Sequence, residues 1–445
     1  MIEQVVEEKK KAGIKMNENK GIMFDEKMVK ELKEQFYMPD EDPKAGRRLF
    51  FDNSGGSLRL KKAVEVKADL ERYPDCPERD HERGLMLKAY VQNGTKEILD
   101  IMFNAKSGAL MSELTASQCM FQIVDLIMDN VEGKNAVVSV LEHPSAFDAM
   151  QYHCEKHGRE LRVVQANPET GRIDPEEVAK LVDQDTCLVS VMSASNISGS
   201  VMDMAGIVKA VRAIKPDIYI ISDAVQHAPH MVMDVETLGL DAMNFAPYKF
   251  FSVRGCGFAY VSDRIANMPH HKIIAKDQKV FELGTPAPGN FAAMMAVIDY
   301  VCSIGEKFIQ SNDRKTLYYE GMRRIHLQER ALLYRLLEGT KEVPGLRHID
   351  GVKISADPES VEGRDLIAGI RIEGMDVVKL GEEYQKRGIT TAPRAATSIY
   401  SKRIVEALGA NQGLVRVSPM HCHSVQDIDE FLKITQEIAV QEARK

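Results

Sequence analysis

The segment that decides the fold is CLVSVMSASNISGSVMDMAGIVKAVRAIKPDIYIISDAVQ, residues 187–226. It contains an apolar run over 187–195, an amphipathic helical pattern over 203–214 and a second apolar run over 217–224. Short β-branched runs separated by a helix-period pattern predict two strands joined by a crossover helix. Such a unit places its strands parallel and its helix on one face of the sheet.

The same alternation extends on both sides of this segment. The sequence predicts helices over 120–131, 145–158 and 174–183, and strands over 135–143, 160–167, 241–246 and 257–262. A mainly parallel sheet must be covered by crossover helices on both faces, and its strands are then apolar throughout. The fold class is therefore predicted to be α/β.

The remaining sequence predicts an N-terminal arm and a second, smaller domain. Residues 1–48 are rich in Lys and Glu, with a helical pattern over 25–35 and a break at MPDEDPKAG. The C-terminal part is predicted to hold long helices over 291–337, strands over 367–374 and 414–419, and helices over 377–388 and 425–439. We predict an arm over 1–48 that joins the small domain, a large domain over 49–300 and a small α+β domain over 301–445.

The charge balance limits the kind of partner. The 445 residues include 58 Lys and Arg against 66 Asp and Glu, a net charge of -8. This balance argues against a nucleic-acid partner and leaves no basic surface for a membrane. The charged start MIEQVVEEKKKAG lacks the apolar core of a secretory signal, and no later apolar run is long enough to span a bilayer. We expect a cytoplasmic protein that acts on small molecules.

The sequence predicts neither disulfides nor a metal site. Its seven cysteines are scattered and form no C-x-x-C pair, which indicates reduced core residues. His421 and His423 flank Cys422, and strand alternation would place both imidazoles on one face. No further ligands lie nearby in the sequence, so we interpret the two histidines as core or solvated residues.

Polar side chains follow several of the predicted strands. His143 follows VVSVLE, Asn196 follows LVSVMSAS, Asp223 ends the run IYIIS, and Lys249 follows MNFAPY. Each of them alone has an ordinary explanation as a helix cap, a turn residue or a surface residue. In open α/β sheets, however, ligands bind at the carboxyl ends of the strands. The joint order of these residues therefore indicates one site.

The three groups that pyridoxal phosphate (PLP) needs are all available at this site. The cofactor requires a lysine that forms an imine, a carboxylate that keeps the pyridine nitrogen protonated, and backbone amides that hold the phosphate. Lys249 would supply the imine and Asp223 the carboxylate. The amides of Thr115 and Ala116, at a helix start within LTASQ, would hold the phosphate through the helix dipole.

In these motifs the chain resembles the class V aminotransferase and cysteine desulfurase-like family of fold-type I PLP-dependent enzymes. The resemblance spans roughly residues 49 to 440. It is carried by LFFDNSGG (49–56), LTASQ (114–118), LEHPS (141–145), ASNISG (194–199), SDAVQ (222–226), APYKFF (246–251), FELGTP (281–286) and LVRVSP (414–419). The resemblance implies a seven-stranded type of sheet in the large domain and a homodimer.

The resemblance also implies roles for particular residues. His143 would stack over the cofactor ring and share in catalysis with Lys249 and Asp223. Other cofactor-binding positions are Asn196 and Gln226 beside the ring hydroxyl, Tyr248 before the lysine, and Thr285 at the phosphate of the neighbouring subunit. Arg416 would bind the substrate α-carboxylate, for which a guanidinium fork is suited. Further substrate-binding candidates are Asn53, Ser54, Gly55 and Arg394, and Arg254 is an alternative to Arg394 for a second acidic group.

The sequence departs from the desulfurase pattern at two places. Tyr248 and Ala246 occupy positions where typical desulfurases have His and Ser, so the phosphate contacts must differ. The segment 387–401 contains no cysteine, whereas desulfurases place their persulfide-forming cysteine there. A hydroxyl such as Thr397 cannot hold a persulfide. Cys422 is the nearest alternative, and we interpret it as a packing residue.

These observations favour a desulfurase-like lyase that acts on an amino-acid substrate by β-elimination and lacks the persulfide-forming cysteine. An aminotransferase uses the same residues without a leaving group, and an epimerase returns the proton to the opposite face. A catalytically silent PLP-fold protein is the alternative from another class. The joint presence of Lys249, Asp223 and Arg416 speaks against that last reading.

Overall fold

The computed structural model describes residues 19–445, so the first 18 residues of the predicted N-terminal arm lie outside the described part of the chain. Its largest sheet has seven strands in the order β4-β10-β9-β8-β7-β5-β6. The strands are β4 (Ala109–Glu113), β5 (Asn135–Ser139), β6 (Glu160–Val164), β7 (Thr186–Ser190), β8 (Tyr219–Asp223), β9 (Ala242–Phe245) and β10 (Gly257–Val261). Only β10 runs against its neighbours. The predicted α/β fold with a mainly parallel seven-stranded sheet is confirmed.

Helices cover both faces of this sheet, which explains why its central strands are buried throughout. One face packs against α5 (Ala116–Asn130) and α6 (Pro144–His157). The other face packs against α8 (Met204–Ile214) and α11 (Pro288–Glu306). Successive residues of β5 illustrate the alternation, because Ala136 and Val138 belong to the first core and Val137 belongs to the second.

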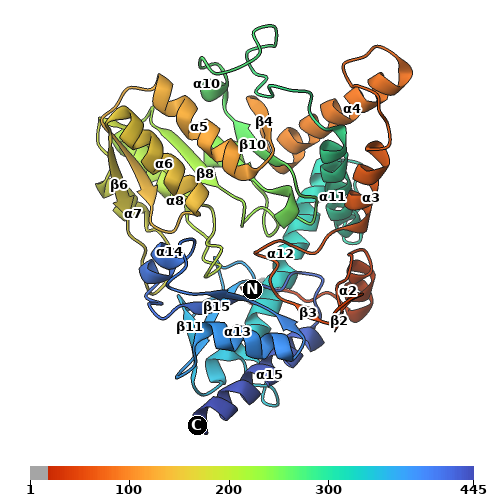
Figure 1. Cartoon of the computed structure of the whole chain (residues 1–445), viewed down its shortest axis with the longest axis vertical. Helices are drawn as coiled ribbons and strands as arrows, with labels where there is room; N and C mark the ends of the chain where they lie inside the picture. The colour runs from red at the N-terminus through yellow and green to blue at the C-terminus, as the bar shows by residue number, and fades with distance from the viewer. Residues whose placement is uncertain (1–18) are drawn as a thin grey trace, which may run out of the picture.

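A second sheet has four antiparallel strands in the order β11-β12-β15-β14. These are β11 (Val352–Ser355), β12 (Ala368–Ile372), β15 (Leu414–Val417) and β14 (Ala392–Arg394). Helices α13 (Val377–Lys386) and α15 (Val425–Ala443) pack against it. Figure 1 shows this sheet in the lower half of the molecule and the seven-stranded sheet in the upper half.

Helix α12 (Arg314–Glu338) contributes to both cores. Its first half packs with the large sheet through residues such as Tyr318 and Met322, and its second half packs with the small sheet through Leu333 and Leu337. Figure 1 shows α12 running from one half of the molecule to the other.

The described part of the predicted arm lies against the C-terminal elements. Helix α2 (Glu26–Lys33) ends in Lys33, whose amine lies 2.9 Å from Asp427 of α15. Strand β3 (Leu49–Phe50) pairs in parallel with β13 (Ile389–Thr390). The division at residues 48 and 300 stays a prediction. The Lys33–Asp427 contact joins the arm to the C-terminal part, and β3, which lies beyond residue 48, pairs with that part too.

The other elements of residues 19–445 are short or lie on the outside of the cores. They are β1 (Glu41–Asp42), β2 (Gly46–Arg47), α3 (Lys61–Leu70), α4 (Glu82–Glu97), the π-helical turn η1 (Ile98–Met102), α7 (Pro175–Lys180), α9 (Val235–Leu238), the 3₁₀ turns η2 (Pro247–Lys249) and η3 (Leu346–His348), α10 (Asp263–Ala266) and α14 (Lys402–Ala407). None of the helices in this part of the chain has the length and apolar character that crossing a membrane requires.

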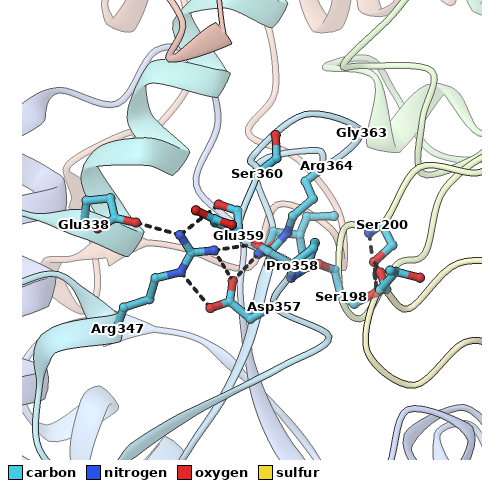
Figure 2. A network of polar contacts seen from close by, with 12 residues as sticks. Ser198, Ser200, Glu338, Arg347, Asp357, Pro358, Glu359, Ser360, Gly363 and Arg364 are labelled. Carbon is cyan, nitrogen blue, oxygen red and sulfur yellow. Dashed lines mark hydrogen bonds and ion pairs between the residues drawn. The ribbon is translucent and has the colours of Figure 1, made fainter.

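An ion-pair network connects the end of α12 to the loop between β11 and β12 (Figure 2). Asp357 accepts hydrogen bonds from Arg347 at 2.7 and 2.8 Å and from Arg364 at 2.7 Å. Arg347 also donates to Glu338, the last residue of α12, at 2.6 Å. The Arg364 side chain is fully buried, so Asp357 balances its charge inside the protein.

The loop over 357–365 also holds the segment that follows β7, residues 195–201. Arg364 donates a long hydrogen bond of 3.4 Å to the carbonyl of Ser198. Two backbone hydrogen bonds of 2.8 and 2.9 Å connect the same loop and segment. Asn196 belongs to this segment, and its position is therefore fixed partly from the C-terminal part of the chain.

Candidate functional site

A cavity of about 240 Å³ lies at the carboxyl ends of the parallel strands. Its lining comes from the segments that follow β4, β5, β7, β8 and β9. The lining residues are Thr115, Ala116, Ser117, His143, Ser145, Met192, Ala194, Asn196, Asp223, Val225, Gln226, Ala246, Tyr248, Lys249 and Arg254. The structure thus brings together every cofactor-binding residue predicted from the sequence except Thr285.

Lys249 ends a tight turn after β9. Its N–H donates to the carbonyl of Ala246 at 2.9 Å, and Phe251 two residues later has a positive φ of 59°. The lysine is only 8% exposed. Burial, and then the nearby charge of Arg416, lower the pKa of its amine to about 8. A lysine in this state has a substantial neutral fraction near neutral pH, which imine formation requires.

Asp223 is the last residue of β8 and lies in the same cavity. It is 4% exposed, and its Oδ1 accepts a hydrogen bond from the N–H of Val225 at 2.9 Å. Burial raises the pKa of this carboxyl, while the Val225 N–H and the charge of Lys249 oppose that rise. A buried carboxylate needs a cationic or proton-donating partner, and a protonated pyridine nitrogen is such a partner.

The start of α5 provides a place for a phosphate. Thr115 caps the helix by accepting a hydrogen bond from the N–H of Gln118 at 3.1 Å. The first N–H groups of a helix have no partner within it and attract anions. Gly257 of β10 approaches this turn so closely that a Cβ there would lie 2.1 Å from the Ala116 nitrogen. Glycine at this position therefore allows the strand to pack against the helix start.

Two buried amides complete the fit to the cofactor. The side-chain oxygens of Asn196 and Gln226 are buried and have no hydrogen-bond partner in the protein, yet both residues line the cavity. Buried polar atoms are normally hydrogen-bonded, so these two call for a partner from a ligand. A ring hydroxyl beside them could donate its one hydrogen to one of these oxygens, and its own oxygen could accept from the NH₂ group of the other amide. The cavity therefore fits PLP by its lysine, its carboxylate, its helix start and its unpaired amides.

His143 caps α6 at the cavity wall. Its Nδ1 accepts a hydrogen bond from the N–H of Ser145 at 3.2 Å. Burial, and then the charge of Lys249, lower the pKa of the imidazole to about 4. The ring is therefore neutral at physiological pH and can stack on a flat heterocycle without adding charge.

Glu142 is a residue of this region that the sequence reasoning missed. Its carboxylate is fully buried and accepts hydrogen bonds from the Ser139 hydroxyl at 2.7 Å and from the Met192 N–H at 2.6 Å. Burial, and then Asp223 among its neighbours, raise the pKa of this carboxyl to about 8. It ties the end of β5 to the segment after β7. The only sequence signal for Glu142 was an acidic residue between an apolar run and a predicted helix. An acidic residue that merely caps a helix gives the same signal.

Arg416 lies outside the cavity lining. Its fully buried guanidinium donates to Asp52 at 2.6 Å and to the carbonyl of Asn196 at 3.0 Å. Arg394 on β14 is partly buried, and burial followed by the charge of Arg416 lowers its pKa to about 10. Both cations lie close enough to lower the pKa of Lys249.

The other predicted substrate residues have partners within the protein. The amide of Asn53 donates to the carbonyls of Phe50 and Ser418, and its oxygen accepts from the N–H of Leu58. The N–H of Ser54 donates to the Ser418 hydroxyl at 3.0 Å. Gly55 packs against Asp52, since a Cβ there would lie 2.7 Å from its carboxylate. In this arrangement the three residues shape the loop beside Arg416.

Two further predictions lie away from the cavity. Thr285 is exposed and donates to Glu78 at 3.1 Å, so its predicted contact across a subunit boundary stays a prediction. His421 lies 2.7 Å from the Tyr300 hydroxyl, and His423 contacts the backbone of Met420. Residues 19–445 contain no group of His, Cys, Asp and Glu side chains arranged to hold a metal ion.

The lowered pKa of Lys249 leads to a pH prediction. We expect the rate of PLP capture by the apoprotein to rise as pH increases through about 8, because the neutral amine is the reactive form. Stopped-flow absorbance from pH 6 to pH 10 measures this rate. A rate that still rises without a midpoint at pH 10, as for an amine with the ordinary lysine value of 10.5, would contradict the assigned environment.

Comparisons with known proteins identify the family of the chain. The Aminotransferase class-V family model matches residues 50–338. A probable cysteine desulfurase of Borreliella burgdorferi is 24% identical over 300 residues, which cover 61% of this chain and 69% of that relative. A cysteine desulfurase of Salmonella choleraesuis is 28% identical over 203 residues, which cover 42% of this chain and 49% of the relative, about half of its length.

Solved structures show the same fold. The apo structure of cysteine desulfurase from Thermococcus onnurineus NA1 superposes with a TM-score of 0.76 at 20% identity, covering 93% of this chain and 98% of that one. The cysteine desulfurase CsdA of Escherichia coli superposes with a TM-score of 0.75 at 14% identity, covering 94% and 99%. With its family-model match extending over more than half of its length, this chain belongs to the aminotransferase class-V family, which is PLP-dependent.

Proposed function

We propose that this protein binds PLP on Lys249 and converts an amino-acid substrate. The observation that carries the proposal is a buried lysine whose pKa is lowered to about 8, lying in one cavity with a buried aspartate and a helix start. PLP supplies an electron sink for the carbanion that forms at the substrate α-carbon. The residues of this chain bind, orient and move protons around that centre.

Lys249 would act as the base that removes and returns the proton at the substrate α-carbon. Its lowered pKa suits a general base that works near neutral pH. Asp223 would hold a proton on the ring nitrogen of the cofactor by its charge. His143, whose imidazole is neutral at physiological pH, would orient the ring by stacking on it.

Arg416 is proposed to bind the substrate carboxylate, as its sequence position indicates. Asp52 now occupies one arm of its guanidinium at 2.6 Å. A substrate carboxylate must therefore displace Asp52 or bind to Arg394 beside it. Removal of Asp52 should strengthen carboxylate binding by freeing that arm, provided that Arg416 remains in place.

We infer that β-elimination from a sulfur-bearing or related amino acid is the reaction. The relatives compared above are cysteine desulfurases, and that activity concerns a C–S bond. The segment 387–401 has no cysteine, and Cys422 is fully buried with its thiol pKa raised by that burial. A buried thiol of raised pKa is a poor nucleophile. Sulfur would accordingly leave as free sulfide or thiol.

The protein is also proposed to act as a homodimer, with Thr285 reaching the phosphate of the second subunit. Thr285 and the neighbouring Leu283 are exposed in the single chain, as expected if a second subunit covers them in the dimer. Sedimentation of the holoprotein distinguishes monomer from dimer.

The test of this function is product analysis with a panel of amino acids, including cysteine, in the presence of PLP. A lyase releases a keto acid, ammonia and sulfide from cysteine without any acceptor. If turnover instead needs a keto-acid acceptor, the protein is an aminotransferase, and the β-elimination proposal is wrong. Racemisation without product release identifies an epimerase, and the absence of PLP uptake identifies a silent fold.

A further inference from the structure

The cavity and its surroundings carry more positive charge than the assigned roles use. Its lining contains one carboxylate, Asp223, against Lys249 and Arg254. Burial, and then the nearby charge of Arg254, lower the pKa of Arg59 to about 10, so the two guanidinium groups lie close together. Within residues 19–445, no carboxylate lies in ion-pair distance of either arginine. Two neighbouring guanidinium groups without an acidic partner favour an anionic ligand.

Arg254 is held beside Tyr248 at the cavity rim. Its guanidinium carbon lies 4.2 Å from the centroid of the tyrosine ring, within cation–π distance. A Cβ on Gly56 would lie 2.9 Å from one of its terminal nitrogens, so glycine leaves room for the guanidinium. Arg59 lies on the same tyrosine at 5.9 Å and donates to the Tyr248 carbonyl at 2.6 Å. These contacts orient the arginine without neutralising it.

The same stretch of the cavity wall contains the helix start that suits a phosphate. Thr115, Ala116 and Ser117 line the cavity together with Arg254. Arg254 lies three residues before Gly257, whose hypothetical Cβ would lie 2.1 Å from the Ala116 nitrogen. Ala246, also in the lining, offers only a methyl group. The anion site at α5 thus offers helix-start amides and the hydroxyls of Thr115 and Ser117, and Arg254 is the arginine that lines the cavity with them.

We propose that Arg254 binds the phosphate group of the cofactor, and that Tyr248 serves as the surface on which its guanidinium is stacked. A guanidinium fork can donate two parallel hydrogen bonds to phosphate oxygens. This inference rests on the proposed binding of PLP. It assigns to Arg254 a cofactor contact rather than a contact to a second acidic group of the substrate.

The experiment compares PLP with pyridoxal, which has the same aldehyde and ring but no phosphate. Binding to the full-length apoprotein is followed by absorbance, for the wild type, Arg254→Met and Arg254→Lys. Arg83→Met is a matched control, because Arg83 is also exposed and lies 5.6 Å from the ring of Tyr73, away from the cavity. Unfolding curves of all variants establish that each is folded.

We expect Arg254→Met to weaken PLP binding by about 10- to 100-fold, the range of a hydrogen bond between charged groups, with Arg254→Lys in between. Its affinity for pyridoxal should stay within about twofold of the wild type, and Arg83→Met should change neither. Equal losses for both ligands, or no loss for either, overturn the inference. Unchanged PLP affinity with weaker binding of dicarboxylic amino acids would instead assign Arg254 to the substrate. If the wild type binds no PLP, the proposed function itself fails.

Discussion

Lys249→Ala is expected to lower kcat by at least about 1,000-fold and to remove the visible absorption band of the bound cofactor. The rate estimate follows because a positioned acid–base group contributes about 10²- to 10⁴-fold, and the covalent anchor is lost as well. Lys249 is the only lysine in the cavity lining. No other amine of the lining can therefore take over either role.

Borohydride reduction of the wild-type holoprotein, followed by peptide mass spectrometry, should locate the cofactor on the peptide that contains Lys249. Added methylamine should restore part of the activity of Lys249→Ala, because it replaces the missing base. Lys215→Ala serves as the control, since its amine bonds the Thr186 carbonyl at 2.9 Å, at the opposite ends of the strands. An alanine variant that keeps both the band and normal turnover would falsify the assignment.

Glu329→Ala is expected to lower the free energy of unfolding by about 3–5 kcal/mol, the cost of removing one partner from a buried ion pair. The Glu329 carboxylate lies 2.7 Å from His230 Nδ1 and accepts a hydrogen bond from the N–H of His421 at 3.1 Å. All three residues are buried, so removal of Glu329 takes away the carboxylate that pairs with His230 and the acceptor of the His421 N–H. Urea unfolding measures the loss.

The same pair has a defined pH dependence. Burial alone would lower the pKa of His230, but Glu329 and Asp365 raise it to about 9. Burial alone would raise the pKa of Glu329, but His230 lowers it to about 2. Relative to unfolded values of 6.5 and 4.5, the pair stabilises fully between these two pH values. Its contribution decreases as pH rises through about 9 or falls through about 2.

The stability difference between wild type and Glu329→Ala should therefore be largest between pH 4.5 and 6.5. Glu373→Ala is the matched control, because its ion pair with Lys353 at 3.3 Å is exposed and is worth about 1 kcal/mol or less. A difference that is independent of pH would show that Glu329 stabilises by packing alone.

The sequence could predict the central sheet because its signals are local. Each strand from β5 to β10 is a short apolar run, and the predicted segments overlap the observed strands. Helices α3 and α4 were not predicted. Helix α4 contains Gly84 and Gly94, and its apolar and polar residues separate only weakly onto opposite faces. Strand β4 was missed because its only partner, β10, lies about 150 residues further along the chain. Its edge position depends on that distant pairing.

Most residues of the candidate site could also be predicted, because their sequence signals are local as well. Residues that follow strands, such as His143 and Lys249, converge because parallel strands end at one edge. The engagement of Arg416 by Asp52 could not be predicted, since 364 residues separate the two in the chain. Motifs identify residue types, but only the folded chain decides which charges are already paired.

The loop over 357–365 links motion of the small sheet thermodynamically to order at Asn196 in the cavity wall. Arg364 and the adjoining backbone hold the segment around Ser198 and Ser200 (Figure 2). Asn196 belongs to the same segment, and Arg416 of the small sheet donates to its carbonyl at 3.0 Å. A ligand that immobilises Asn196 must then also reduce the fluctuations of the small sheet. By thermodynamic reciprocity, a contact that restrains the small sheet from outside raises the affinity for that ligand by the same factor.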